Sequence, residues 1–143
     1  MQELSSVLKM IEAWQRQGIS LWPPLAWPEV AATLGRLGRP LSQDIIGLYC
    51  LTGGMSVDEM DDVCLTLWTL NRVISDNSKS PGPYLCFADF LIDSHWYGLK
   101  YQNPEKSAVY AYYFGDINAE RVADSLDEFF HLLLNDPGKL GLF

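Results

Sequence analysis

The sequence predicts an α+β domain: an antiparallel β-sheet of about four or more strands, flanked by N-terminal helices and a C-terminal amphipathic helix. Two observations predict it. Apolar residues recur with helical spacing over the early part of the chain and again near its end, whereas between residues 63 and 114 they alternate as in strands. The strand candidates are joined by short polar connections, which favour an antiparallel meander. We expect residues 1–143 to form one domain.

The first helix is expected to stop near Gly18, and its apolar positions keep helical spacing at Leu4, Val7, Leu8, Ile11 and Trp14. Prolines forbid a regular element over residues 21–28, but Trp22 and Trp27 favour burial, so we expect an ordered, docked connector. The alternative is a proline-rich ligand segment, although P-x-x-P spacing is missing. Pro28 suits the first turn of a second helix that ends at Gly38.

A third helix is predicted with Ser42 as its N-cap and Asp44 in its first turn, where a negative charge is favourable. The pair Gly53–Gly54 is expected to end it. A double glycine can also cradle phosphate, but here no Lys-Ser/Thr follows and the glycines close a helix, so the helix-ending role is favoured.

Strands are expected at residues 63–68, 85–93, 95–102 and 107–114. Thr69 is expected to cap a short helix through Val73 and Ile74, followed by a loop at 75–83, SDNSKSPGP. The chain then closes with a capping box at 125–128 and an apolar stripe predicting a helix packed on the sheet: Leu126, Phe129, Phe130, Leu133 and Leu134.

The ordered set of elements resembles the SUKH superfamily, whose best-known members resemble the yeast cell-wall assembly regulator. Four segments carry the resemblance: 41–54 (LSQDIIGLYCLTGG), 65–74 (LTLWTLNRVI), 87–101 (FADFLIDSHWYGLKY) and 122–134 (VADSLDEFFHLLL). Thr52 stands where the family usually has Asn, and Leu126 where it usually has Phe. The resemblance implies a protein-binding role. Many bacterial relatives are held to be immunity proteins that block polymorphic toxins, often nucleases, and no catalytic residue carries over.

Charge narrows the class of partner. The first 57 residues carry four basic and four acidic residues, whereas the rest carry six against fourteen, which is the whole formal net charge of −8. Such a field repels nucleic acid and anionic lipid and attracts cationic partners. No stretch approaches the roughly 18 apolar residues needed to span a bilayer, and residues 1–14 do not resemble a secretory signal.

We therefore expect a surface that steers and pairs with a basic protein, combining carboxylates with aromatic anchors. Its expected members are Asp58, Glu59, Asp61, Asp62, Asp89, Asp93, Trp96 and Tyr97. Glu105 and Asp116 would extend it around the sheet. The alternative is that the acidic run 56–62 is only a solvated loop, and its spacing does not match a calcium loop.

Catalytic signals are few. His131 lies one helical turn from Asp127, but no third metal ligand is evident, so a solvated ion pair is expected. His95 is adjacent in sequence to Asp93 and Ser94, and adjacent residues do not converge as a triad. We expect no enzyme activity, metal or cofactor. The cysteines are expected to be small core residues in a reducing cytosol: Cys50, Cys64 and Cys86.

The function expected from these observations is that of a cytoplasmic immunity protein that occludes a cationic toxin domain. A regulatory or scaffold module of the same fold, with no toxin partner, is the first alternative. A small-molecule binder that uses a pocket between sheet and helices is the second.

Overall fold

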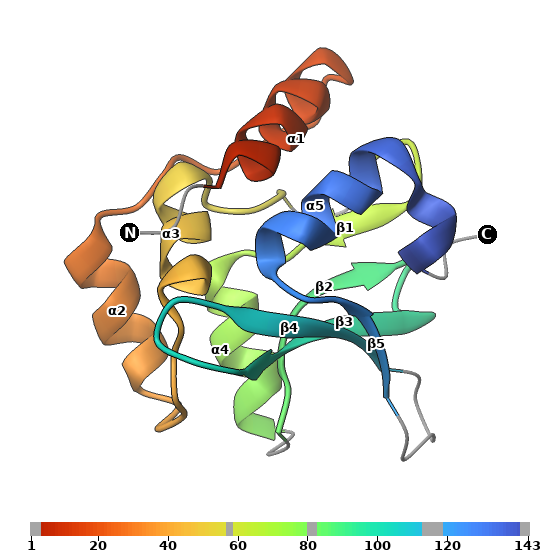
Figure 1. Ribbon diagram of the computed structural model, residues 1–143. Coiled ribbons are helices and arrows are strands. Elements are labelled where there is room, and N and C mark those ends of the chain that lie inside the picture. The colour runs from red at the N-terminus through yellow and green to blue at the C-terminus, as the bar shows by residue number, and fades with distance from the viewer. Residues whose placement is uncertain (1–3, 57–58, 80–82, 113–118, 141–143) are drawn as a thin grey trace.

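The computed structural model describes residues 4–56, 59–79, 83–112 and 119–140 (Figure 1). Its helices are α1 (Ser5–Arg16), α2 (Trp27–Gly35), α3 (Gln43–Leu51), α4 (Leu70–Lys79), α5 (Leu126–Asn135) and a final 3-10 turn, η1 (Pro137–Leu140). Its strands are β1 (Leu65–Leu67), β2 (Leu85–Phe90), β3 (His95–Tyr101), β4 (Ser107–Tyr112) and β5 (Glu120–Ala123). The predicted α+β fold is confirmed.

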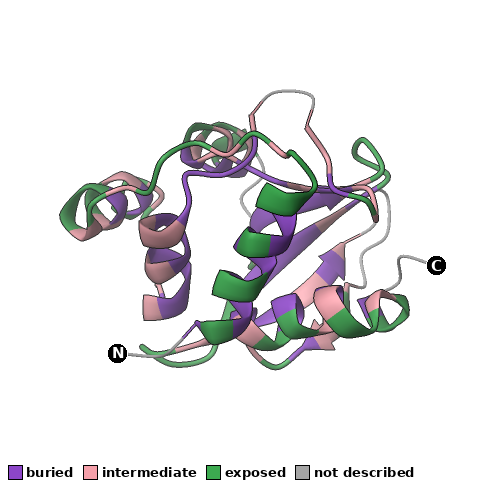
Figure 2. Cartoon of the chain, turned by 90° about the horizontal axis from the view of Figure 1, so that it is seen from above, coloured by how far each residue is buried: buried purple, intermediate pink, exposed green. Residues whose placement is uncertain are grey.

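The five strands form one antiparallel sheet in chain order, β1-β2-β3-β4-β5. α5 packs on one face of this sheet, and α1 packs against α5. α2 and α3 pack against each other (Figure 1). Buried residues line the sides of the helices that face the sheet (Figure 2). The core is rich in aromatic side chains that meet edge to face, such as Phe87 with Phe129 at 5.5 Å between ring centroids.

The Ser125 N-cap predicted for the last helix is present, but the Glu128 side chain bonds the residue before the cap instead of completing the predicted capping box. The Ser125 hydroxyl oxygen accepts a hydrogen bond from the Glu128 backbone N–H at 3.1 Å, and the Glu128 carboxylate accepts one from Asp124 N–H. Asp127, in the same turn, accepts hydrogen bonds from the N–H groups of Ser6 (2.9 Å) and Val7 (3.3 Å). α5 therefore caps the N-terminus of α1, which its own sequence leaves without a side-chain cap.

The region after β1 differs from the prediction. Thr69 does cap a helix, since its hydroxyl accepts from Arg72 N–H, but α4 runs on to Lys79 through residues expected to be loop. Asn77 explains the extension: its amide donates to the Val73 and Cys86 carbonyls and accepts from Cys86 N–H. These bonds tie the polar last turn of the helix to β2.

The connector 21–26 is docked by its backbone. The Trp22 N–H donates a hydrogen bond to the Gly54 carbonyl at 2.8 Å, and the Gly53 N–H donates one to the Trp22 carbonyl at 2.8 Å. A Cβ on Gly53 would lie 2.6 Å from the Pro23 carbonyl oxygen, so only glycine permits this approach. The Trp22 side chain is 55% exposed, so the expectation that it is buried is wrong.

Candidate functional site

A hollow of about 420 Å³ opens between the segment before β1, the start of α4 and the β2–β3 turn. We call it the acidic hollow, because the described residues that line it include three acids and a single cation, Arg72. It is lined by Met55, Ser56, Glu59, Met60, Thr66, Leu67, Trp68, Thr69, Arg72, Asp89, Ile92 and Asp93. Three of the predicted site residues therefore come together here: Glu59, Asp89 and Asp93.

Arg72 organises the carboxylates at the hollow. Its guanidinium contacts Asp76 at 3.0 Å, Asp89 at 3.2 Å and Asp93 at 2.6 Å. Its central carbon lies 4.0 Å from the Trp68 ring centroid, a cation–π contact. Burial alone would lower the pKa of Arg72, but hydrogen bonds to Asp76 and Asp93 outweigh burial and raise it. One cation among three carboxylates leaves the group with a net negative charge.

Asp89 is a structural anchor. Its side chain is buried, and it accepts hydrogen bonds from Trp68 Nε1 at 2.7 Å, from Arg72 Nη1 at 3.2 Å and from Asp93 N–H at 2.9 Å. Asp89 lines the hollow, as expected of a site residue, but its carboxylate is almost fully buried and already has these three partners. Its structural role is therefore to hold the wall of the hollow, and it offers little surface for direct contact.

The β2–β3 turn, residues 91–94, has an unusual backbone. Leu91, Ile92 and Asp93 have φ angles of 46°, 50° and 63°, so three successive non-glycine residues are left-handed. This region is costly for L-residues and most costly for a β-branched one such as Ile92. The predicted strand 85–93 therefore ends at Phe90, and its last three residues form the turn.

Contacts with the rest of the fold hold this turn in place. Leu91 N–H donates to the Cys64 carbonyl at 2.8 Å, which joins the turn to the start of β1. The Asp93 carboxylate accepts from Trp96 Nε1 at 2.9 Å as well as from Arg72. Trp96 is half-buried and meets Trp68 edge to face at 4.8 Å. Asp93 and Trp96 are thus two predicted site residues that are at least partly exposed and whose contacts stabilise the turn.

Tyr97 and Asp61, which the prediction places on the contact surface, are buried in the structure. Tyr97 is fully buried on the opposite face of β3 from Trp96, and its hydroxyl donates to the Leu140 carbonyl at 2.6 Å. Asp61 is buried too: it accepts from Trp14 Nε1 at 2.9 Å and from Leu65 N–H at 2.9 Å. Burial raises the pKa of the Asp61 carboxyl. Neither side chain can meet a partner in this fold, so both expectations are wrong.

The remaining predicted acids are placed as follows. Asp62 is exposed, Glu59 is half-buried in the hollow, and Asp58 lies outside the described residues. Glu105 lies in the β3–β4 connection, at the opposite end of β3 from the acidic hollow, and Asp116 is not among the described residues. Among the described residues, the expected acids that come together are therefore Glu59, Asp89 and Asp93, at the acidic hollow.

The histidines are placed as follows. His95 is buried between the rings of Phe90 and Tyr97, at 5.2 and 4.9 Å, and burial lowers its pKa. His131 is exposed beside Asn135, and Asp127, its expected partner, caps α1 instead. Within the described ranges, no three His, Cys, Asp or Glu side chains converge as metal ligands.

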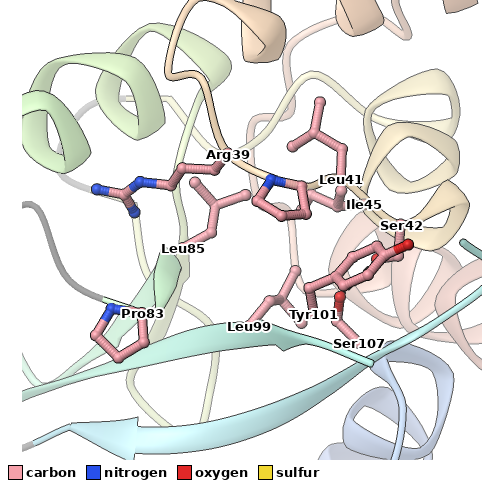
Figure 3. A pocket seen from close by; sticks show the side chains of 10 residues that line it. Arg39, Leu41, Ser42, Ile45, Pro83, Leu85, Leu99, Tyr101 and Ser107 are labelled. Atoms are coloured by element: carbon pink, nitrogen blue, oxygen red, sulfur yellow. Dashed lines mark hydrogen bonds between the residues drawn. The ribbon is translucent and has the colours of Figure 1, made fainter. Parts of the chain in front are cut away.

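A second, smaller hollow of about 120 Å³ lies between the α2–α3 connection and the sheet (Figure 3). Arg39 and Pro83 lie at one end, Ser42, Ser107 and Tyr101 at the other, and the aliphatic side chains of Leu41, Ile45, Leu85 and Leu99 lie between them.

Behind this second hollow, Ser42 occupies the N-cap position of α3 as predicted, but its hydroxyl bonds Asp44 and Ser107 instead of capping the helix. Asp44 is buried, and Ser107 N–H donates to its carboxylate at 3.3 Å. Burial raises the pKa of Asp44, which outweighs the opposing effect of these hydrogen bonds.

Sequence reasoning missed Arg72. Its i,i+4 relation to Asp76 would have been visible had α4 been extended past Ile74. Its contacts with Asp89 and Asp93 span 17 and 21 residues and leave no local signal.

Comparison with known proteins adds no relative: no protein-family model matches the chain, and no curated protein matches it. None of the helices in the described part of the chain has the length and apolar character required to cross a bilayer.

Proposed function

We propose that this chain is a protein-binding module that docks a basic protein at the acidic hollow. Within that class, we propose an immunity protein of the SUKH kind that neutralises a cationic toxin domain, as the sequence resemblance implies. The observation that carries the proposal is the hollow itself, where one guanidinium fixes a surplus of carboxylates beside apolar side chains.

The chemistry of the hollow suits a Lys or Arg side chain from a partner. Met55, Met60 and Ile92 offer apolar contact to an aliphatic stem, while Glu59 and Asp93 offer carboxylates to the cationic head. Because Arg72 already orders Asp93, less side-chain entropy is lost on binding. The surplus of negative charge also speeds encounter with a basic partner.

The test uses the protein encoded next to this chain as the candidate partner. We expect co-expression to protect cells from that protein, and the dissociation constant to rise steeply with salt. Glu59→Lys should weaken binding by about tenfold or more. Glu105→Lys, the same charge reversal at the far end of β3, is the matched control and should have little effect.

Asp61→Lys is unsuitable for this test because the buried carboxylate supports the fold. Salt-independent binding, or equal losses in Glu59→Lys and Glu105→Lys, would contradict docking at the hollow. Binding without protection of cells would instead favour the regulatory or scaffold alternative.

A further inference from the structure

We propose that the 91–94 turn is the apolar anchor of the docking surface, and that its occupant is a protein surface with an aliphatic-sized recess bordered by Lys or Arg. This inference rests on the proposed protein-binding function and deepens it, because it names what the partner must carry. It also assigns a role to Leu91 and Ile92, which lie outside the set of site residues expected from the sequence.

The first observation is exposure. Ile92 is 76% exposed and Leu91 48% exposed. Large apolar side chains exposed elsewhere on the described residues are Leu8, Trp22 and Tyr101, each on a separate segment. Leu91 and Ile92 are thus the one adjacent pair among them. Single exposed apolar residues are ordinary, so it is the adjacency of these two, beside the acidic hollow, that distinguishes this turn.

The second observation is the backbone of the turn: it closes the hairpin, with Ser94 N–H donating to the Phe90 carbonyl at 2.9 Å, but it does so with three left-handed non-glycine residues. Asn or Gly would adopt the left-handed backbone at Ile92 with little cost, yet the sequence places a β-branched aliphatic residue there. The conformation is stabilised by hydrogen bonds from the turn to the Asp89 carboxylate and the Cys64 carbonyl, and by the ion pair with Arg72. Strain that the surrounding fold sustains, and that projects a side chain into solvent, points to binding.

The third observation is the charge beside the tip. Ile92 lines the acidic hollow together with Glu59 and Asp93, so the apolar side chain and the carboxylates face the same region. A partner that buries Ile92 must therefore place its own surface next to a net negative charge. Lys or Arg side chains around the recess satisfy that requirement, whereas an acidic or purely apolar rim would desolvate Glu59 and leave the net negative charge of the Arg72 group without a counter-charge from the partner.

The experiment uses a phage-displayed library of disulfide-cyclised peptides as the probe, selected on the full chain. The selected peptides are then measured against Ile92→Asn, Leu91→Gln and Leu8→Gln. Leu8 is the matched control because it is 49% exposed, as Leu91 is, but lies on α1. Ile92→Asn removes the apolar tip while suiting the left-handed backbone, so the variant should remain folded.

We expect the selected peptides to be enriched in both aromatic and basic residues. We also expect their affinity to fall by about tenfold or more in Ile92→Asn and Leu91→Gln, with Leu8→Gln unchanged. Thermal melting of Ile92→Asn at or above the wild-type temperature would show that the loss is not one of folding.

Two results would overturn the inference. In the first, basic peptides bind Ile92→Asn and Leu91→Gln as tightly as wild type but lose affinity for Glu59→Lys. This result would contradict the apolar anchor and would still support the proposed function. Peptides without basic residues, or peptides insensitive to both the turn variants and Glu59→Lys, would overturn the anchor and the acidic docking site together.

Discussion

The two hairpin turns at the ends of β3 are stabilised by different sets of contacts. In the β3–β4 connection, the Asn103 side-chain oxygen accepts from the N–H groups of Glu105 (2.9 Å) and Lys106 (3.0 Å), so the turn is satisfied by its own polar residues. The 91–94 turn has apolar residues, three left-handed backbone positions and anchors on distant elements. Each turn also has contacts of the other kind: Gln43 N–H donates to the Pro104 carbonyl at 2.7 Å, and Ser94 N–H donates to the Phe90 carbonyl at 2.9 Å. The balance nevertheless differs, because only the 91–94 turn combines left-handed apolar residues with an ion pair to a distant helix.

A buried aspartate lies next to each hairpin, and the two aspartates differ in the groups that bond their carboxylates. Asp89 behind the 91–94 turn contacts Arg72, whereas Asp44 behind the start of β4 is bonded by the Ser42 hydroxyl and Ser107 N–H. Both carboxyls are buried. The turn proposed to bind a partner is thus the one with an ion pair behind it.

The largest effect is expected from Asp89→Ala. It leaves Trp68 Nε1 and Arg72 without their shared acceptor and should lower the free energy of unfolding by about 3–5 kcal/mol in urea titration. Asp76→Ala removes a more exposed contact of the same guanidinium and should cost about 1 kcal/mol or less. Equal losses in the two variants would show that the turn does not depend on the buried anchor.

A pH effect is expected at the other hairpin. Because burial raises the pKa of Asp44 above 3.8, the folded state takes up this proton at a higher pH than the unfolded chain. The stabilisation from Asp44 is therefore fully present below about pH 3.8 and is lost as pH rises through the raised pKa.

Chemical unfolding of wild type and Asp44→Asn across pH isolates this effect, because other titrating groups such as His95 are common to both. Wild type should lose stability relative to the variant by about 1.4 kcal/mol for each pH unit between the two pKa values. A difference that is constant with pH would contradict the raised pKa.

A smaller loss is expected from Asn103→Ala. Two backbone N–H groups lose their acceptor, but both are in an exposed turn where water replaces it. We expect a loss of about 1 kcal/mol in the free energy of unfolding. No loss at all would show that the polar turn, too, is held by tertiary contacts.

The smallest change, and one of opposite sign, is expected from Ile92→Asn in the absence of any partner. The exposed side chain contributes little burial, and Asn accommodates the left-handed backbone, so stability should rise by up to about 1 kcal/mol. A clear destabilisation would mean that Ile92 supports the fold, and the comparison between the turns would fail.

The sequence predicted those elements whose signals are local. Ser125 and the apolar stripe of α5 are read from neighbouring positions, and the fold class followed from them and from the strand periodicity. The end of α4 was missed because Asn77 is stabilised by β2, not by its neighbours. β5 was not predicted because Glu120–Ala123 is short and half-polar and is defined by its pairing with β4.

The candidate site was predicted only in part for the same reason. Acid composition identified Glu59 and Asp93 but could not separate them from Asp61, whose partner Trp14 lies 47 residues away. Composition likewise gave no sign that Tyr97 faces inward while Trp96 faces outward, since both faces of β3 carry aromatic residues. Whether a carboxylate is an anchor or a contact depends on tertiary neighbours.

Cys64 offers a practical way to observe this surface. It is half-exposed, and its carbonyl holds the 91–94 turn, whereas Cys86 is buried and burial raises its thiol pKa to about 12. Once Cys50 is replaced by serine, a thiol-reactive fluorophore has a single reachable attachment point next to the tip. A fluorophore on Cys64 would therefore report ligand binding at this surface through a change in its emission, with no new cysteine introduced.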